Sequence, residues 1–149
     1  MLVKVISGGQ TGVGRAGLDA AMEANIPVGG ACPKGRKAED GAIPEQYPLT
    51  ELKTVSYTIR SERNARDSDA TLILNLGGLS GATAKTREYA HQHGRPYLVL
   101  QLEQNPDPHE VRHWLEQHQV RVLNIAGPRE SKRPGIYTRS LAFLREVLV

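Results

Sequence analysis

Short apolar runs alternate with helical patterns along the whole chain. The runs expected to form strands are residues 2–6, 28–32, 70–76, 97–100 and 121–125. The segments expected to form helices are residues 12–25, 57–67, 82–93, 107–118 and 136–148. Apolar strands that alternate with helices are typical of a parallel sheet with helices on both faces. The sequence therefore predicts an α/β fold, a single Rossmann-like three-layer α/β/α domain over residues 1–149 with a mainly parallel sheet of about five strands.

Two glycine-rich turns follow the first and third of these strands. They are Ser7-Gly8-Gly9-Gln10-Thr11-Gly12 and Gly77-Gly78-Leu79-Ser80-Gly81-Ala82-Thr83. A turn of this kind exposes backbone N–H groups and points the N-terminus of the next helix at solvent, which favours an anion. A strand order of 2-1-3-4-5, counted along the chain, would bring both turns to the crevice where the strand order reverses. The two turns therefore predict one phosphate-bearing ligand that is held from both sides.

Side chains near these turns could add contacts to that ligand. Gln10 and Thr11 could donate hydrogen bonds, and Arg15 could reach back as a cation from the following helix. The hydroxyl of Thr83 either contacts the ligand or caps its helix. A third segment, residues 124–131, either closes the far side of the ligand or is an ordinary loop. The residues predicted to bind the ligand are Gly8, Gly9, Gln10, Thr11, Gly12, Arg15, Gly77, Gly78, Ser80, Gly81, Thr83, Thr86, Arg129 and Ser131.

A long connection follows the second strand. Its first part, residues 33–41, mixes both charge signs with two glycines and is either a flap over the ligand or a solvated loop. Connections of this length are often functional. No nucleophile is paired with a base in the sequence, so no catalytic residue is assigned. The candidates for a catalytic carboxylate, should the protein be an enzyme, are Glu39, Asp40 and Glu130.

Two familiar nucleotide-binding patterns are incomplete. Residues 9–16 approach a P-loop, but Arg15 and Ala16 stand where that loop needs Lys and Ser or Thr. Residues 12–17 match G-x-G-x-x-G, but a dinucleotide fingerprint begins directly at the strand end. The first turn is therefore not expected to hydrolyse ATP or to bind NAD.

The segment His109-Glu110-Val111-Arg112-His113 matches the H-E-x-x-H zinc pattern. The apolar face of its helix is expected to hold Val111, Trp114, Leu115 and His118. At about 100° per residue, His109 and His113 point away from that face, toward solvent. No third ligand is evident, and no metal site is expected.

Composition narrows the class of partner. The net charge is +3, the basic residues are scattered, and there is one Phe and one Trp. A nucleic-acid binder usually shows a dense basic stripe or interleaved aromatic residues, so a small anionic ligand is preferred. No apolar run has bilayer-spanning length, and no signal peptide is evident. Cys32 is the single cysteine, and a cytoplasmic location is expected.

Five segments, in this order, resemble one family. They are residues 7–13, 32–41, 66–69, 81–86 and 124–131. The chain resembles the "putative molybdenum carrier" proteins, a circularly permuted YpsA-type branch of the Rossmann-like SLOG superfamily, which includes the lysine decarboxylase-like LOG proteins. The resemblance covers nearly the whole chain.

The resemblance implies a Rossmann-like fold, a homo-oligomer and a nucleotide-like ligand at the glycine turns. The family name implies molybdenum cofactor or molybdate. Gly14 stands where relatives usually carry an aspartate, and Thr86 stands where the LOG motif has a glutamate. These departures favour a binding or carrier protein for a phosphate-bearing, nucleotide-like ligand. The alternative is a LOG-type nucleotide phosphoribohydrolase.

Overall fold

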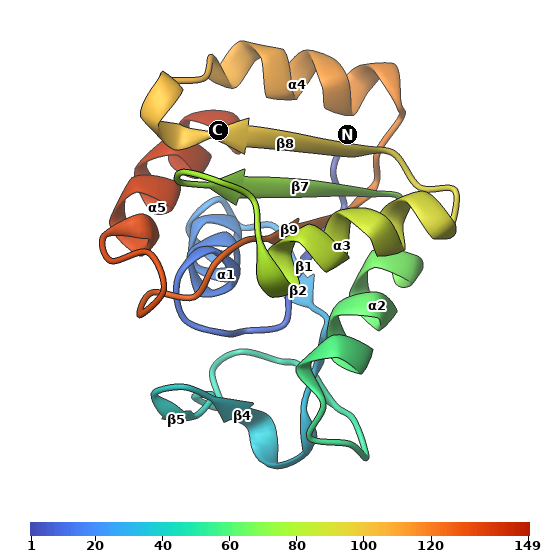
Figure 1. Cartoon of the computed structure of the whole chain (residues 1–149). Helices are drawn as coiled ribbons and strands as arrows, with labels where there is room; N and C mark the ends of the chain where they lie inside the picture. Colours follow the sequence, from blue (N-terminus) through green and yellow to red (C-terminus); the bar gives the residue numbers. More distant parts are fainter.

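A five-stranded parallel sheet forms the centre of the fold. The computed structural model describes all 149 residues. The strands lie in the order β2 (Val28–Gly29), β1 (Lys4–Ile6), β9 (Val122–Ala126), β7 (Ala70–Asn75) and β8 (Tyr97–Gln101). Every neighbouring pair is parallel, so all five carboxyl ends lie at one edge of the sheet (Figure 1). The predicted α/β class with a parallel five-stranded sheet is confirmed.

The last strand lies in the middle of the sheet, so the predicted order 2-1-3-4-5 is wrong. Leu123 of β9 lies opposite Val5 of β1 on one side and Ala70 of β7 on the other. Leu123 and Ile125 are buried, whereas no residue of the edge strand β8 is buried. All of these strands are apolar in sequence, so their composition did not reveal which one is central. The two glycine-rich turns are consequently separated by β9.

The strand order becomes regular when the chain ends are joined. Counted from β9 through the joined ends, the order is 3-2-1-4-5, which is that of a doubly wound dinucleotide-binding sheet. Met1 and Leu2 line the same surface groove as Val147, Leu148 and Val149, so the two chain ends border one groove. The fold is therefore a doubly wound sheet in which the chain ends lie between the first and second strands of that order, β9 and β1.

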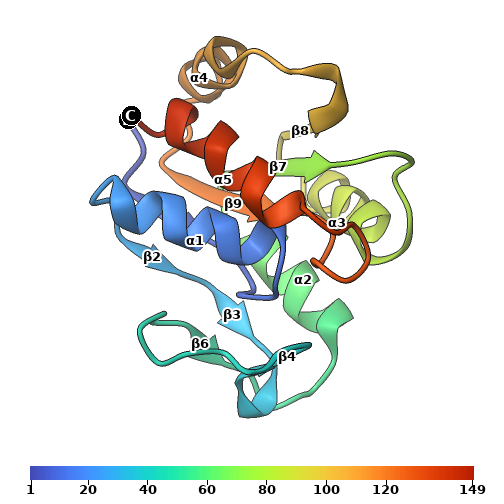
Figure 2. The ribbon, with the colours of Figure 1, turned by 90° about the vertical axis from the view of Figure 1, so that its left-hand side faces the viewer.

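Helices cover both faces of the sheet. α1 (Val13–Glu23), α4 (Pro108–Gln117) and α5 (Ile136–Val147) lie on one face, and α2 (Tyr57–Asp67) and α3 (Gly81–Gln92) lie on the other (Figure 2). α1 packs along α5, and α2 packs along α3. Right-handed crossovers produce this division, because β1 to β2 and β7 to β8 run in opposite directions across the sheet. The chain leaves β9 and β7 toward opposite faces, which opens a crevice at their carboxyl ends.

The expected strand 28–32 is split at Gly30. Its φ is +122°, and a Cβ there would lie 2.2 Å from the carbonyl oxygen of Ser7. The chain therefore bends, and β3 (Ala31–Cys32) leaves the main sheet to pair with β6 (Thr50–Glu51).

The connection between β3 and β6 carries short regular elements. They are the 3-10 turn η1 (Lys34–Arg36) and the antiparallel pair β4 (Lys37–Ala38) and β5 (Gly41–Ala42). This small hairpin extends away from the main sheet (Figure 1). A second 3-10 turn, η2 (Leu102–Gln104), follows β8.

α4 presents its histidines to solvent. Val111 is buried in the core, whereas His109 and His113 are exposed, as the helical geometry predicted. His118 was expected on the apolar face but is exposed. It is the C-cap residue that follows the last turn of α4, and its ring lies edge-on to Trp114 with the ring centroids 5.7 Å apart. No helix of the chain combines the length and the apolar character needed to cross a bilayer.

Candidate functional site

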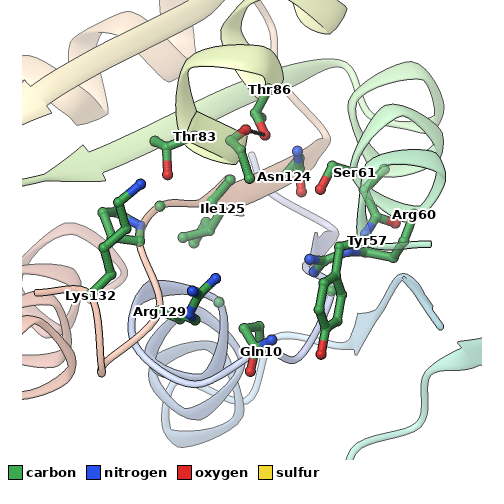
Figure 3. Close-up of a pocket in the computed structure, with 17 residues that line it drawn as sticks. Gln10, Tyr57, Arg60, Ser61, Thr83, Thr86, Asn124, Ile125, Arg129 and Lys132 are labelled. Atoms are coloured by element: carbon green, nitrogen blue, oxygen red, sulfur yellow. Dashed lines mark hydrogen bonds between the residues drawn. The ribbon is translucent and has the colours of Figure 1, made fainter. Parts of the chain in front are cut away.

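A cavity of about 110 Å³ lies at the carboxyl ends of β1 and β9 (Figure 3). It lies between the helices on the two faces of the sheet, with α1 on one side and α2 and α3 on the other. Four segments form its walls: the first glycine-rich turn with the start of α1, one face of α2, the first turns of α3, and the segment from β9 toward α5. Of the residues predicted to bind a ligand, it is lined by Gly8, Gln10, Thr83, Thr86 and Arg129.

No residue of α2 was predicted from the sequence to bind a ligand. Tyr57, Arg60, Ser61 and Asn64 all line the cavity. They are spaced i, i+3, i+4 and i+7, which places them on one face of a helix, and this polar stripe is the signal that could have found them. Asn64 fixes the helix, because its side chain accepts a hydrogen bond from the Ala31 N–H at 2.8 Å and donates one to the Ala31 carbonyl at 3.0 Å.

Arg60 enters the cavity without a carboxylate partner. Its Nε is buried and has no hydrogen-bond partner, and Arg60 belongs to none of the ion pairs in the chain. The guanidinium passes directly over Gly8, where a Cβ would lie 1.4 Å from its Nη1. Burial lowers the pKa of Arg60 to about 10, so the group is still charged at neutral pH.

The α3 wall adds hydroxyl groups, and a second cation without an ion pair approaches it from the segment between β9 and α5. Thr83 and Thr86 are buried, and the Thr86 hydroxyl donates to the Ala82 carbonyl at 3.1 Å. Ser80, and not Thr83, is the N-cap residue of α3, and its side chain makes no capping hydrogen bond. Lys132 approaches this first turn, with its Nζ 2.8 Å from the place a Cβ would take on Gly81. Lys132, like Arg60, forms no ion pair.

Three of the predicted ligand contacts are bonded to Glu39 instead. The Glu39 carboxylate accepts hydrogen bonds from the Thr11 hydroxyl and from both the N–H and the hydroxyl of Ser131. Arg129 Nε lies 3.3 Å from the same carboxylate. Burial alone would raise the pKa of Glu39, but these hydrogen bonds and Arg129 outweigh it and hold the pKa below its usual value. We call this arrangement the Glu39 clasp.

Arg15 and Gln10, beside the first turn, also have partners within the chain. Arg15 donates to the Gly9 carbonyl at 2.9 Å and pairs with Asp40 at 3.1 Å. Gln10 Oε1 accepts hydrogen bonds from the N–H groups of Thr11 and Glu39. The segment 33–41 thus lies against the first turn, but none of its residues lines the cavity.

Thr11, Gly12 and Arg15 line a separate, more open cavity of about 360 Å³ together with Asp19, Tyr47, Glu130, Tyr137 and Thr138. Asp19 accepts a hydrogen bond of 2.5 Å from each of the two tyrosine hydroxyls. Glu130 accepts from the N–H groups of Gly135 and Tyr137, so it caps the start of α5.

The second glycine-rich turn is only partly at the cavity. The Gly77 N–H is bonded to the carboxylate of Glu103. Arg133 donates to the carbonyls of Leu76 and Gly78 and braces the turn from the other side. Gly77, Gly78, Ser80 and Gly81 do not line the cavity, whereas Ala82, Thr83 and Thr86 do.

The charged side chains that line the cavity are all positive. Its lining includes three cationic side chains, those of Arg60, Arg129 and Lys132, and no carboxylate. The three candidate catalytic carboxylates lie outside it, in the contacts described above. A concave site with unpaired cations, hydroxyl groups and a helix N-terminus suits a negatively charged ligand. No group of three or more His, Cys, Asp or Glu side chains is placed to hold a metal ion.

Comparisons with known proteins agree with this architecture. Residues 5–148 match the model of the circularly permutated YpsA SLOG family. A crystal structure of a "Putative molybdenum carrier protein" from Syntrophus aciditrophicus is 43% identical in sequence and has a TM-score of 0.94, covering 99% of this chain and 96% of that one. No curated protein shows significant similarity to the chain. The family match over nearly the full length explains why the strand order is regular only when the ends are joined: the chain belongs to the circularly permutated YpsA SLOG family.

Proposed function

We propose that the protein binds a phosphate-bearing, nucleotide-like small molecule and places its phosphate in the cavity between α2, α3 and β9. The observation that carries this proposal is the charge of the lining, which has three cations and no carboxylate. Two of those cations, Arg60 and Lys132, form no ion pair within the chain, and the only aromatic contact of Arg60 in the site is with the Tyr57 ring at 5.7 Å. An anion would therefore restore charge balance at a site that the fold has already formed.

The size of the cavity supports a phosphate in particular. Sites that enclose a whole small molecule have volumes of roughly 300–1,000 Å³, whereas this cavity has about 110 Å³. It therefore accommodates the charged end of a ligand while the remainder extends outside. Molybdate is also a compact tetrahedral oxyanion, and the related crystal structure is named for a molybdenum carrier. Molybdate and the phosphate of molybdenum cofactor are therefore included among the candidate ligands.

The site supports binding better than hydrolysis. A LOG-type phosphoribohydrolase would need a carboxylate at the position of Thr86, and the Thr86 hydroxyl instead donates to a backbone carbonyl. Glu39, Asp40 and Glu130 are bonded elsewhere. A general acid or base must reach the reacting atoms within about 3 Å or through one water. We therefore expect incubation with AMP to release no adenine.

Isothermal titration calorimetry at low salt tests the proposal. AMP should bind at least tenfold more tightly than adenosine, because only AMP carries the phosphate. Lys132→Met combined with Arg60→Met should weaken AMP binding by at least about tenfold, since a hydrogen bond to a charged group contributes about 1.5–3 kcal/mol. Lys85→Met combined with Arg63→Met is the matched control, because both residues lie outside the cavity.

Equal binding of AMP and adenosine would contradict the proposal. Titrations with phosphate and with molybdate show whether the anion alone is sufficient. Native mass spectrometry of the freshly purified protein gives the mass of any ligand that remains bound, which separates a pterin from a nucleotide and from a bare oxyanion. Self-association and a cytoplasmic location stay predictions.

A further inference from the structure

We propose, building on that function, that the cavity recognises a diphosphate group, with one phosphate against Arg60 and the other against Lys132 at the first turn of α3. The ligand class is then a diphosphate ester, such as a nucleoside diphosphate. A monophosphate would satisfy only one of the two cations.

The Arg60 wall provides the first anion position. The Arg60 guanidinium lies over the Tyr57 ring at 5.7 Å, but its buried Nε has no hydrogen-bond partner and no carboxylate balances its charge. A guanidinium presents several N–H donors in a fork that matches phosphate oxygens. Figure 3 shows the guanidinium directed from α2 into the cavity. Gly8 leaves the space that lets it lie there, because any side chain at that position would displace it.

The Lys132 wall provides the second anion position. The N-terminus of α3 carries a partial positive charge, and neither an acidic residue in its first turn nor a side-chain cap neutralises it. An ammonium group beside a helix N-terminus is a repulsive arrangement. An anion bound between Lys132 and the N–H groups of α3 would turn both repulsive partners into attractive ones.

The two positions lie on different walls of one cavity. In Figure 3, Arg60 and Lys132 approach from opposite sides, and Ile125 of β9 lies between them. The third cation, Arg129, is already close to the Glu39 carboxylate, so its charge is partly balanced. Two linked phosphates would therefore give each unpaired cation its own anion.

Calorimetry with inorganic phosphate and pyrophosphate tests this assignment on the full chain. For the unmodified protein we expect pyrophosphate to bind at least tenfold more tightly than phosphate. Arg60→Met should lower pyrophosphate affinity to about the level of phosphate and change phosphate affinity by less than threefold, because phosphate can still bind at Lys132. Lys132→Met should do the same, with phosphate held at Arg60. Arg63→Met is the matched control on α2, since Arg63 pairs with Asp67 and lies outside the cavity.

The outcomes separate this inference from the proposed function. If either variant lowers phosphate and pyrophosphate affinity by the same factor, one phosphate contacts both cations and the diphosphate assignment is wrong, although the phosphate site stands. If neither anion binds, both proposals fail. Titration with ADP and AMP then identifies the source of the diphosphate. A nucleotide ligand requires the same ADP preference in the unmodified protein and its loss in both variants, and an ADP preference that survives either variant would overturn the assignment.

Discussion

At the scale of single residues, the site depends on a contact between a glycine and an arginine from distant parts of the chain. Gly8 follows β1, Arg60 lies on α2, and the guanidinium covers the glycine so closely that no other residue type leaves room for it. The glycine is recognisable in the sequence as part of a turn. Its second role, leaving space for Arg60, depends on packing between segments and is visible only in the folded chain.

The Gly8→Ala variant isolates this role. Gly8 does not have a positive φ, so alanine fits the backbone, but the methyl group would displace the guanidinium. We expect an approximately tenfold loss of pyrophosphate affinity, like that of Arg60→Met, with a melting temperature lowered by less than about 4 °C. Gly78→Ala is the control, because nothing lies within 4 Å of a Cβ there and its φ is not positive. Unchanged pyrophosphate affinity in Gly8→Ala would show that Arg60 does not need its present position.

At the scale of elements, the hairpin β4–β5 is held against the site by side chains. Glu39 contacts the first turn through Thr11 and the β9–α5 segment through Ser131, and Asp40 pairs with Arg15. The Glu39 clasp therefore joins three segments that lie far apart in the sequence. The contacts are partly exposed, so they can open without disturbing the core.

Glu39→Gln should loosen this hairpin. The amide keeps one acceptor oxygen and replaces the other with a donor, so it cannot accept all of the hydrogen bonds from Thr11 and Ser131. A net loss of about 1 kcal/mol corresponds to roughly fivefold faster tryptic cleavage after Arg36 and Lys37. Glu45→Gln, an exposed residue of the same connection, is the control. Equal cleavage rates in the two variants would mean that the clasp does not restrain the hairpin.

The clasp also makes a pH prediction. Because the pKa of Glu39 is lower in the folded chain, its stabilising contribution is present above the usual glutamate pKa and is lost as the pH falls through the lowered value. The difference in melting temperature between the unmodified protein and Glu39→Gln should therefore be constant near neutral pH. It should shrink under acidic conditions below the usual range of a glutamate. A difference that grows as the pH falls would have the wrong sign.

Local sequence patterns predicted where the helices and strands lie, but not which strands are neighbours in the sheet. The range 57–67 is that of α2, and α5 begins at the predicted residue, because helix periodicity and capping are local properties. The position of β9 depended on which strands pair, which local patterns do not encode. The same distinction applies to the candidate site: Thr83 and Gln10, which were predicted from their turns, line the cavity, whereas Arg60 lies on a helix from which no site residue was predicted.

At the scale of the whole molecule, the strand order of the sheet does not depend on which loop contains the two chain ends. Met1 and Val149, the two ends of the chain, border one groove on the surface. Counted from β9, the strand order is the regular 3-2-1-4-5. The chain ends therefore lie near the amino end of β1, whereas the cavity lies at the carboxyl ends of β1 and β9.

A circular permutant tests this independence. Joining Val149 to Met1 through a short glycine-serine linker and opening the chain at the exposed residue Gln119 would make β9 the first strand. We expect the same fold, a melting temperature within about 5 °C of the original and unchanged anion binding, since permutation is tolerated at surface loops near adjacent ends. Circular dichroism and calorimetry provide the measurements. A permutant that fails to fold, beside a control that carries the linker on an unjoined terminus, would contradict the expectation.

The central place of β9 also has a consequence for how the protein is made. β1 with β2 and β7 with β8 form two separate strand pairs, and within the sheet only β9 is hydrogen-bonded to both pairs. β8 is complete at Gln101 and β9 begins at Val122, so between these two points of synthesis the nascent chain holds two half-sheets with open apolar edges. Chaperone protection should matter most in that interval, and a stop codon placed shortly before β9 should yield an aggregating product rather than a smaller folded one.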